Sequence, residues 1–378
     1  MRVYQFRHQG NGASLGGGHL AVNQTVAPEP LHLSCKIVKR RTNIFFKARA
    51  QQLTTSNSDK LVTIIGGSGF IGRHVVRALA KHGYRVRVAC RRPDLAGHVV
   101  PLGVPGQIVP IQANVRFPAS LAAACEGAFA VINLTAVFHN AGAQTFEAVH
   151  EFGAMAIAKA AKTAKAQVFI HMSGLGTDKP STSIYVKSRA KGEANAAANF
   201  PNAIIIRPSV VFGPEDNLFN KFALMARFSP ILPLIGGGQA KFQPVFVGDV
   251  AEAIVTLVDR GAADGKTYEL GGPEVMSFKQ ILQFVVKTTQ RKRVLLPIPF
   301  SVASIMGAVA GLLPNPALTK DQVELLKADN LVDAKAETEG RTLEGLGITA
   351  RTVEAIVPSY LYRFRKAGQF SLPNAKPE

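Results

Sequence analysis

Cysteine is scarce in this sequence of 378 residues, and its scarcity excludes two ways of stabilising a fold. The three cysteines, Cys35, Cys90 and Cys125, lie far apart and include no C-x-x-C pair. They predict neither a disulfide framework nor a zinc site, and they fit a reducing compartment. No His/Cys/Asp cluster has metal-ligand spacing, and no G-x-S-x-G motif is present, so we predict no metal and no nucleophilic serine of that type.

Acidic residues are also in short supply, with 25 Asp and Glu against 44 Lys and Arg. Residues 1–58 hold eight of the basic residues and one acid, Glu29, so this segment contributes +7 of the net charge of +19 and the remainder contributes +12. A basic folded part favours anionic partners, such as a dinucleotide, acidic lipid headgroups or an acidic protein face. Nucleic acid is not expected, because no basic helix or aromatic stacking motif accompanies the charge.

Residues 1–58 lack sustained hydrophobic periodicity, and we expect this basic N-terminal extension to be disordered. Its many basic residues and few acids are typical of an organellar transit peptide, although a clear amphipathic helix is missing, as is the apolar core of a secretory signal. The alternative is that translation starts near residues 53–59 and that the preceding codons are wrongly assigned. The sequence leaves both interpretations open.

Long apolar runs are limited to one stretch without charge, between residues 293 and 320. Pro297 and Pro299 leave only 300–313 as a continuous helix, which is shorter than the ~20 residues that a spanning helix needs. The stretch either packs inside a small lobe or forms an interfacial patch against a membrane or a membrane-bound partner. The aromatic and basic residues 360–366 present the same choice between core packing and an interface anchor.

The sequence does contain an apolar strand that runs into closely spaced glycines. Residues 61–65 are apolar and β-branched, and residues 70–82 have helical periodicity. Glycines at 67, 69 and 72 fit G-x-G-x-x-G, a turn in which bare backbone and the first N–H groups of a helix hold a pyrophosphate. The alternative is a purely structural turn. We predict cofactor contacts from Gly66, Gly67, Ser68, Gly69, Phe70, Ile71 and Gly72.

The next strand, 85–90, ends in Arg91 and Arg92, where NAD-binding versions of this unit tend to carry an acid. Two guanidiniums at this place fit the 2′-phosphate of NADP through charge-assisted, forked hydrogen bonds. The sequence therefore predicts NADPH as the cofactor, with NAD less favoured. A pair of solvated arginines at a strand end is the alternative.

From Asp59 onward, apolar strands alternate with Ala-rich helical stretches, which predicts an α/β fold with a Rossmann-type, doubly wound parallel sheet. We place the NAD(P)-binding domain at 59–262 and a small C-terminal lobe at 263–378. Asp249 is predicted to cap a helix at 250–258. The expected strands are 61–65, 85–90, 107–112, 129–133, 167–172 and 203–206, and the expected helices are 70–82, 117–126, 144–164, 184–199 and 217–228.

Candidate catalytic residues follow the strand at 167–172, because ligands of an open parallel sheet lie beyond the carboxyl ends of its strands. Ser173 ends this strand, and Tyr185 begins the next helix. A tyrosine transfers protons near neutrality only beside a cation, and Arg189 at i+4 shares its helix face. We therefore predict that Ser173, Tyr185 and Arg189 face the nicotinamide.

Other polar residues near strand ends are weaker candidates. Asn133 and Thr135 after the fourth strand, and Asn114 after the third, are predicted either to line the cofactor site or to serve as turn residues. His171 is expected to be a buried structural histidine, and Arg207 is expected to fix the loop after the sixth strand.

The glycine motif, Ser173, Tyr185 and the segment 207–214 together resemble the extended and atypical short-chain dehydrogenase/reductase superfamily over residues 59–370. Within it, the sequence is most similar to the nucleotide-binding accessory subunit of respiratory complex I and its alphaproteobacterial relatives. The similarity lies in residues 66–76, 207–214, 233–238, 243–250, 268–273 and 360–365.

This resemblance implies tight NADPH binding through Gly66, Gly69, Gly72 and Arg91. It implies complex I subunits as partners, near the quinone-proximal arm. It also implies a peripheral position on the inner membrane, on the cytoplasmic face in bacteria or on the matrix face in mitochondria.

One residue departs from the superfamily pattern, which expects Tyr-x-x-x-Lys. Here Arg189 takes the place of the lysine, and an arginine is bulkier, permanently charged and differently forked. The departure argues against hydride-transfer catalysis without excluding it, and the resemblance implies a non-catalytic accessory role. The alternatives are a soluble NAD(P)-dependent reductase, epimerase or dehydratase, and a quinone- or lipid-handling assembly chaperone.

Overall fold

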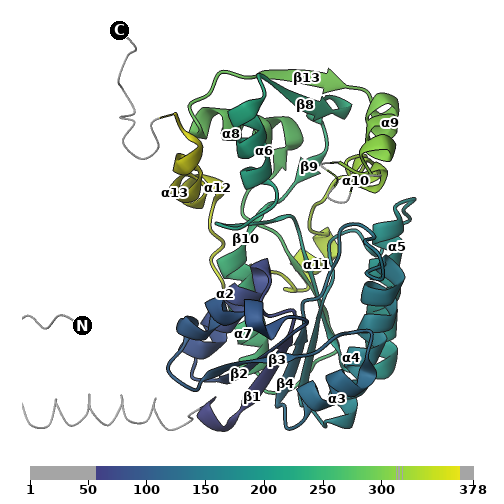
Figure 1. Cartoon of the computed structure of the whole chain (residues 1–378), viewed down its shortest axis with the longest axis vertical. Coiled ribbons are helices and arrows are strands. Elements are labelled where there is room, and N and C mark those ends of the chain that lie inside the picture. Colours follow the sequence, from purple (N-terminus) through teal and green to yellow (C-terminus); the bar gives the residue numbers. More distant parts are fainter. Residues whose placement is uncertain (1–56, 312, 314–315, 317, 367–378) are drawn as a thin grey trace, which may run out of the picture. The chain divides into compact units, whose positions relative to one another are not determined.

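The computed structural model describes residues 57–311, 313, 316 and 318–366 (Figure 1). The predicted N-terminal extension therefore lies outside the described residues, apart from its last two, which begin a 3₁₀ turn at Asn57–Asp59. The disorder, transit-peptide and start-codon interpretations of that segment stay predictions.

The centre of the fold is a seven-stranded sheet in which all neighbouring strands run parallel. Its order is β11-β6-β5-β4-β1-β2-β3, so the direction of winding changes between β1 and β4. This arrangement confirms the Rossmann-type, doubly wound α/β fold. The strands are β1 (Leu61–Ile65), β2 (Arg85–Cys90), β3 (Ile108–Gln112), β4 (Ala130–Asn133), β5 (Val168–Met172), β6 (Ile204–Pro208) and β11 (Thr267–Leu270).

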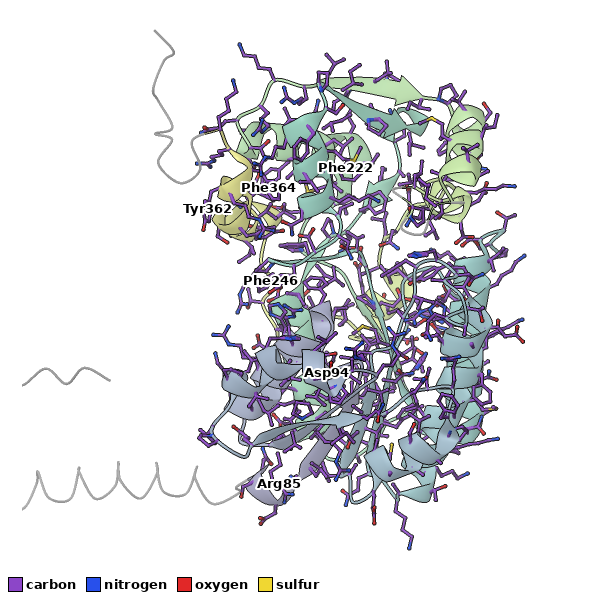
Figure 2. All side chains as sticks on the ribbon, viewed as in Figure 1. Arg85, Asp94, Phe222, Phe246, Tyr362 and Phe364 are labelled. Atoms are coloured by element: carbon purple, nitrogen blue, oxygen red, sulfur yellow. The ribbon has the colours of Figure 1, made fainter. Side chains whose placement is uncertain are left out.

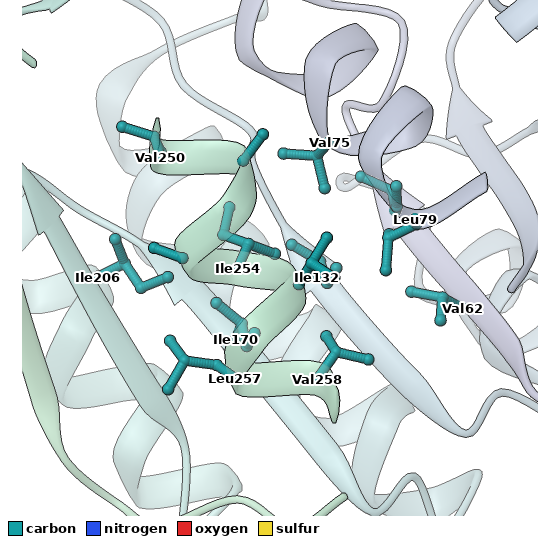
Figure 3. Packing of buried hydrophobic residues seen from close by; sticks show 14 of the residues in the cluster. Val62, Val75, Leu79, Ile132, Ile170, Ile206, Val250, Ile254, Leu257 and Val258 are labelled. Carbon is teal, nitrogen blue, oxygen red and sulfur yellow. The ribbon is translucent and has the colours of Figure 1, made fainter. Parts of the chain in front are cut away.

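Apolar residues on both faces of the sheet explain why helices cover both. In β1, Val62 and Ile64 join the buried cluster of one face, and Ile65 joins that of the other. Helices α2 and α7 pack on the first face through residues such as Leu79 and Ile254 (Figure 3). The flanking helices are α2 (Phe70–Lys81) and α7 (Val247–Asp259) on the first face, and α3 (Pro118–Cys125), α4 (Gly153–Thr163) and α5 (Ile184–Asn199) on the second.

A second lobe is built from two separate segments of the chain (Figure 1). Its core brings Phe219 and Ala223 of the first segment against Ile281, Val285 and Leu361 of the second. The first segment supplies β7 (Val211–Phe212), α6 (Phe219–Phe228), β8 (Ile231–Ile235), β9 (Lys241–Phe242) and β10 (Val245–Phe246). The second supplies β12 (Met276–Ser277), α8 (Phe278–Thr288), β13 (Val294–Ile298), α9 (Phe300–Ala310), α10 (Lys320–Leu325), α12 (Val353–Ile356) and α13 (Pro358–Leu361). Helix α11 (Ala334–Thr338) begins beside the sheet edge, where the N–H of Asp333 donates to the Glu269 carboxylate of β11 at 2.9 Å.

The edge strand β11 is absent from the sequence-based prediction, and the predicted lobe boundary at 262 falls before it. Its sequence, Thr-Tyr-Glu-Leu, is short and carries a charge in the middle. Glu269 is nevertheless buried, because the guanidinium of Arg207 on β6 lies 3.4 Å from its carboxylate. Backbone pairing with β6, the burial of Tyr268 and Leu270 and this ion pair together hold the segment in the sheet.

The helix expected at 250–258 begins at Val247, and no side chain caps it. The prediction of Asp249 as the cap is therefore wrong. Asp249 is buried in the first turn, where it accepts the backbone N–H of Arg351 at 2.7 Å and lies 3.4 Å from that residue's guanidinium. Burial raises the pKa of Asp249. The helix expected at 144–164 also differs, because a π-helix at Glu147–Phe152 precedes α4.

The uncharged stretch is only partly buried. Helix α9 buries Ala303 and Gly307 but leaves Ile305 68% and Val309 65% exposed. The prediction that this stretch packs inside the lobe is therefore wrong for the outer face of α9. In the part of the chain that the structure describes, no helix has the length and apolar character needed to cross a membrane.

The basic aromatic tail packs mainly into the lobe. Tyr360 is buried and donates its hydroxyl to the Asp216 carboxylate at 2.6 Å, and Phe364 is also buried (Figure 2). Arg365 donates its Nε to the carbonyl oxygen of Thr288 at 3.0 Å, and Tyr362 is the more exposed ring. These contacts confirm core packing for the two buried aromatics.

Candidate functional site

The glycine turn after β1 is closed so tightly that only glycine fits at position 72, the third glycine of the motif. Gly66 has a φ of 86°, and its N–H donates to the carbonyl oxygen of Ala89 on β2 at 2.9 Å. A Cβ at Gly72 would lie 2.5 Å from the Gly66 oxygen and 2.6 Å from the Gly67 Cα. Helix α2 can approach the turn this closely only because position 72 has no side chain.

The first turn of α2 offers backbone donors without a side-chain acceptor. Gly69 is the N-cap residue, and it makes no side-chain cap hydrogen bond. The N–H groups at the start of such a helix point outward with partial positive charge, which suits a phosphate. Phe70 and Ile71 contribute these N–H groups, and the carbonyl oxygen of Ser68 lies 3.1 Å from His98 Nε2. The turn therefore fits a dinucleotide pyrophosphate.

The two arginines after β2 are not equivalent. Both are exposed, but Arg92 donates to the Asp94 carboxylate through Nε and an Nη atom at 2.8–3.2 Å. The pairing lowers the pKa of Asp94, first through these hydrogen bonds. Arg91 makes no ion pair or side-chain hydrogen bond with any described residue. Its guanidinium is the freer of the two for a ribose phosphate.

The polar residues after β3 and β4 are engaged in local hydrogen bonds. Asn133 is buried, and its Oδ1 accepts both the N–H and the hydroxyl of Thr135 at 3.0 and 2.6 Å. Its Nδ2 lies 2.9 Å from His171 Nδ1 on β5, which ties the two strand ends together. Asn114 forms a turn in which its Oδ1 accepts the N–H of Arg116 at 3.1 Å. These contacts position the loops that would line a cofactor, and whether the residues also touch it stays a prediction.

Arg189 is a buried cation that holds two strand ends. It is 2% exposed, and its guanidinium donates to the carbonyl oxygen of Met172 at the end of β5 and to that of Thr135 after β4, the latter at 3.3 Å. No carboxylate of the described residues forms an ion pair with it. A buried charge without a counter-ion is costly, so carbonyl dipoles or a bound anionic group must compensate it.

Tyr185 lies in an aromatic cluster one turn before Arg189. Its ring stacks on Phe138 with centroids 5.8 Å apart, and the rings of Phe146 and His150 meet it edge-on. Its hydroxyl makes no hydrogen bond to a described residue. Tyr185 and Arg189 both lie within α5 at the predicted i+4 spacing, and the Tyr185 hydroxyl is free to contact a ligand.

Three buried polar atoms near this helix lack hydrogen-bond partners among the described residues: Ser173 Oγ, Arg189 Nε and His171 Nε2. Buried polar atoms are nearly always satisfied, so a cluster of exceptions indicates that a ligand or water completes the site. The structure thus gathers Ser173, Tyr185 and Arg189 around the carboxyl end of β5, where the nicotinamide end of a dinucleotide would lie. His171 is buried as expected, but only its Nδ1 has a hydrogen-bond partner among the described residues.

His150 is a site residue that the sequence reasoning missed. Its Nε2 accepts the N–H of Val137 at 3.0 Å, and its Nδ1 lies 2.9 Å from the hydroxyl of Ser188, which donates to the Tyr185 carbonyl oxygen at 2.7 Å. Burial and the charge of Arg189 lower the pKa of His150 to about 3, so the ring is neutral. No sequence motif indicates this residue, because its partners lie in the loop after β4 and on α5.

Arg207 is occupied by three carboxylates. It lies 2.7 Å from Glu193 of α5, 3.0 Å from Asp178 and 3.4 Å from Glu269 of β11. Burial alone would lower the pKa of Arg207, but the hydrogen bonds with Glu193 and the charges of the three acids outweigh it and raise the pKa. The network joins α5 to the sheet edge, which supports the structural role predicted for Arg207. The described residues also contain no cluster of histidine, cysteine and acidic side chains that could hold a metal.

Comparison with known proteins identifies the fold and its relatives. The model of the NAD dependent epimerase/dehydratase family matches residues 62–271. A mitochondrial NADH dehydrogenase (ubiquinone) 1 alpha subcomplex subunit 9 of Arabidopsis thaliana is 33% identical over 326 residues, which cover 83% of this chain and 80% of that protein. The protein of the same name from Mus musculus is 33% identical over 315 residues, with 82% of each chain covered.

Among solved structures, the NADPH complex of an NADPH-dependent quinone oxidoreductase from Escherichia coli is similar with a TM-score of 0.64. The two share 19% sequence identity, and the match covers 80% of this chain and 99% of that one. At this identity the similarity concerns the fold alone. The chain has the NAD(P)-binding fold, and the residues that match the NAD dependent epimerase/dehydratase model include the glycine turn.

Proposed function

Because the chain belongs to the NAD dependent epimerase/dehydratase family, and within it to the family of the NADH dehydrogenase (ubiquinone) 1 alpha subcomplex subunit 9 proteins, we propose that it holds NADPH as a long-lived structural group in a respiratory NADH dehydrogenase assembly. The glycine turn and the first turn of α2 would hold the pyrophosphate. Arg91 would bind the 2′-phosphate. Tyr185 and Arg189 would lie beside the nicotinamide half.

The hydrogen bonds of Arg189 support the non-catalytic part of this proposal. Its two Nη atoms donate to the carbonyl oxygens of Met172 and Thr135, so the side chain connects two strand ends. A lysine in this place would be a compact point charge free to contact ribose hydroxyls and to tune the tyrosine. A guanidinium that is hydrogen-bonded to the backbone favours a structural role for Arg189 in the cofactor site over a role in proton transfer.

The direct test is purification without added nucleotide. The proposal expects the absorbance and fluorescence of reduced nicotinamide in the purified protein, and enzymatic analysis should identify the released compound as NADPH. An empty protein that turns over carbonyl substrates with added NADPH would contradict it.

Peripheral contact with the inner membrane forms the second part of the proposal. The outer face of α9 exposes Val302, Ile305, Met306 and Val309, and the last three line a shallow hollow with Ala310 and Leu313. Apolar area of this kind on a basic protein suits the surface of a bilayer with anionic headgroups.

The parallel pair of β13 and β8 adds apolar area in the same lobe. Val294 lies opposite Ile231 in the pair, and both are exposed. Nearby, Phe228 is 76% exposed beneath the guanidinium of Arg227, 5.5 Å from its ring. Fractionating cells in low and high salt tests this contact. A protein found wholly in the soluble fraction under both conditions would contradict it.

A second candidate function, a reductase of the extended short-chain type, is favoured by the Ser173 hydroxyl, which is buried without a partner among the described residues. Arg189→Lys restores the superfamily pattern. If the site is a disabled enzyme, this variant gains measurable NADPH oxidation with quinone or ketone acceptors. Unchanged inactivity would mean that Tyr185 does not serve as the acid.

A further inference from the structure

The helix that carries Tyr185 and Arg189 begins at a junction with the second lobe. Ser183 is the N-cap of α5, and its hydroxyl accepts the N–H of Val186 at 3.2 Å. The N–H groups of Ile184 and Tyr185 precede this one and cannot bond within the helix. Their acceptor is Asp321 of α10, which is 137 residues from Ile184 along the chain.

Asp321 accepts the two N–H groups at the start of α5 that have no acceptor within the helix. Its Oδ1 accepts the N–H of Ile184 at 2.7 Å, and its Oδ2 accepts the hydroxyl of Ser183 at 2.9 Å and the N–H of Tyr185 at 3.3 Å. A carboxylate in this place also complements the positive end of the helix dipole. A second contact, from the Thr182 hydroxyl to Glu324 at 3.1 Å, lies one turn further along α10.

Helix α10 is itself fixed by the second lobe. Thr319 and Gln322 form a reciprocal capping box at its start. Val323 is fully buried in a cluster with Ile235 of β8 and Ala303 of α9. A Cβ at Gly307 of α9 would lie 2.8 Å from the Lys320 nitrogen, so the two helices approach backbone to backbone. The lobe therefore sets where the Asp321 carboxylate lies.

We propose that Asp321 is a positioning residue for the nicotinamide half of the dinucleotide site. It anchors the turn that contains Tyr185, and Arg189 lies on the next turn of the same helix. The second lobe thereby completes a site whose phosphate half lies entirely on the sheet side, at α2 and β2. This inference rests on the proposed NADPH binding and adds to it that the two halves of the site depend on different parts of the chain.

The experiment compares two ligands on the full chain by calorimetry. NADPH occupies both halves, whereas adenosine 2′,5′-bisphosphate occupies only the phosphate and adenine half. Asp321→Ala should weaken NADPH about 10-fold and leave adenosine 2′,5′-bisphosphate within about 2-fold, the size of coupling expected for linked sites. Asp321→Asn keeps one carbonyl acceptor and should retain most of the affinity. Glu337→Ala removes an exposed acid of α11 as a matched control and should change neither ligand.

The outcomes separate the two proposals. If Asp321→Ala weakens both ligands equally, or neither, the positioning role is overturned while NADPH binding stands. If the unmodified protein binds adenosine 2′,5′-bisphosphate but not NADPH, or binds neither, both proposals fall. Thermal unfolding without ligand identifies a variant that has lost its fold, and in that case Asp321→Asn gives the comparison.

Discussion

At the scale of the residue, Arg91 and Arg92 differ in what they already bind. Arg92 pairs with Asp94, and Arg91 has no partner among the described residues. We predict that Arg91→Ala lowers NADPH affinity at least 10-fold, because a charge-assisted hydrogen bond contributes about 1.5–3 kcal/mol. NADH affinity should change less than about 2-fold, and Arg92→Ala should spare both ligands. Equal losses for NADPH and NADH in a calorimetric titration would refute the 2′-phosphate contact.

Gly72 offers a test of the turn itself. A methyl group there would lie within 2.6 Å of the Gly67 backbone, so Gly72→Ala forces α2 away from β1. We expect a loss of about 1–3 kcal/mol in unfolding free energy and a loss of dinucleotide binding. Gly97→Ala is the matched control, because nothing lies within 4 Å of its added methyl group. Denaturant unfolding of the two variants checks the difference, and similar values for both would contradict the tight turn.

At the scale of the element, α9 is a helix with one buried and one exposed apolar face. Ile305→Asp combined with Val309→Asp should abolish co-sedimentation with vesicles that contain anionic lipid. The unfolding free energy should stay within about 0.5 kcal/mol, because both side chains are more than 60% exposed. Val104→Asp changes an equally exposed valine between η3 (Gly97–Leu102) and β3 and should leave vesicle binding intact. Vesicle binding by the double variant at the unmodified level would exclude α9 as the contact.

Elements with a strong local pattern were predictable, and those held by distant partners were not. The apolar, β-branched residues of β1 and β2 predict these strands from local sequence alone. The Ala-rich periodicity of α5 predicts that helix in the same way. β11 is held by distant partners, since it pairs with β6 and its Glu269 forms an ion pair with Arg207. The same holds for the site. The glycine spacing predicted the turn, whereas the roles of His150 and Asp321 depend on contacts with residues that are far away in the sequence.

At the scale of the whole molecule, two buried histidines make stability depend on pH. Burial, with the charge of Arg189, lowers the pKa of His150 and of His171 to about 3 from a reference of 6.5. Below pH 6.5 the unfolded chain takes up protons that the native state refuses, so stability falls as the pH drops from 6.5 toward 3. At pH 5 we expect a loss of about 2 kcal/mol for each histidine, measured by urea unfolding.

Two buried acids act in the opposite direction. Burial raises the pKa of Asp216 and of Asp249, so their native forms accept protons more readily than the unfolded chain. Their contribution to stability rises as the pH falls through those raised values.

The variants His150→Gln and His171→Gln test the contribution of the histidines, and each should reduce the loss of stability between pH 7 and 5. An unchanged slope in both variants would assign the dependence to other groups.

The return of the chain from the second lobe to β11 has a consequence for shortened forms of the protein. A premature stop at any codon between 247 and 266 would remove the outer neighbour of β6 and leave its row of N–H and C=O groups bare. Such a product would lack about its last third. It would also expose β6 as an unpaired edge strand, which can pair with strands of other chains. Nonsense alleles in this interval should thus give insoluble polypeptide rather than a smaller working protein.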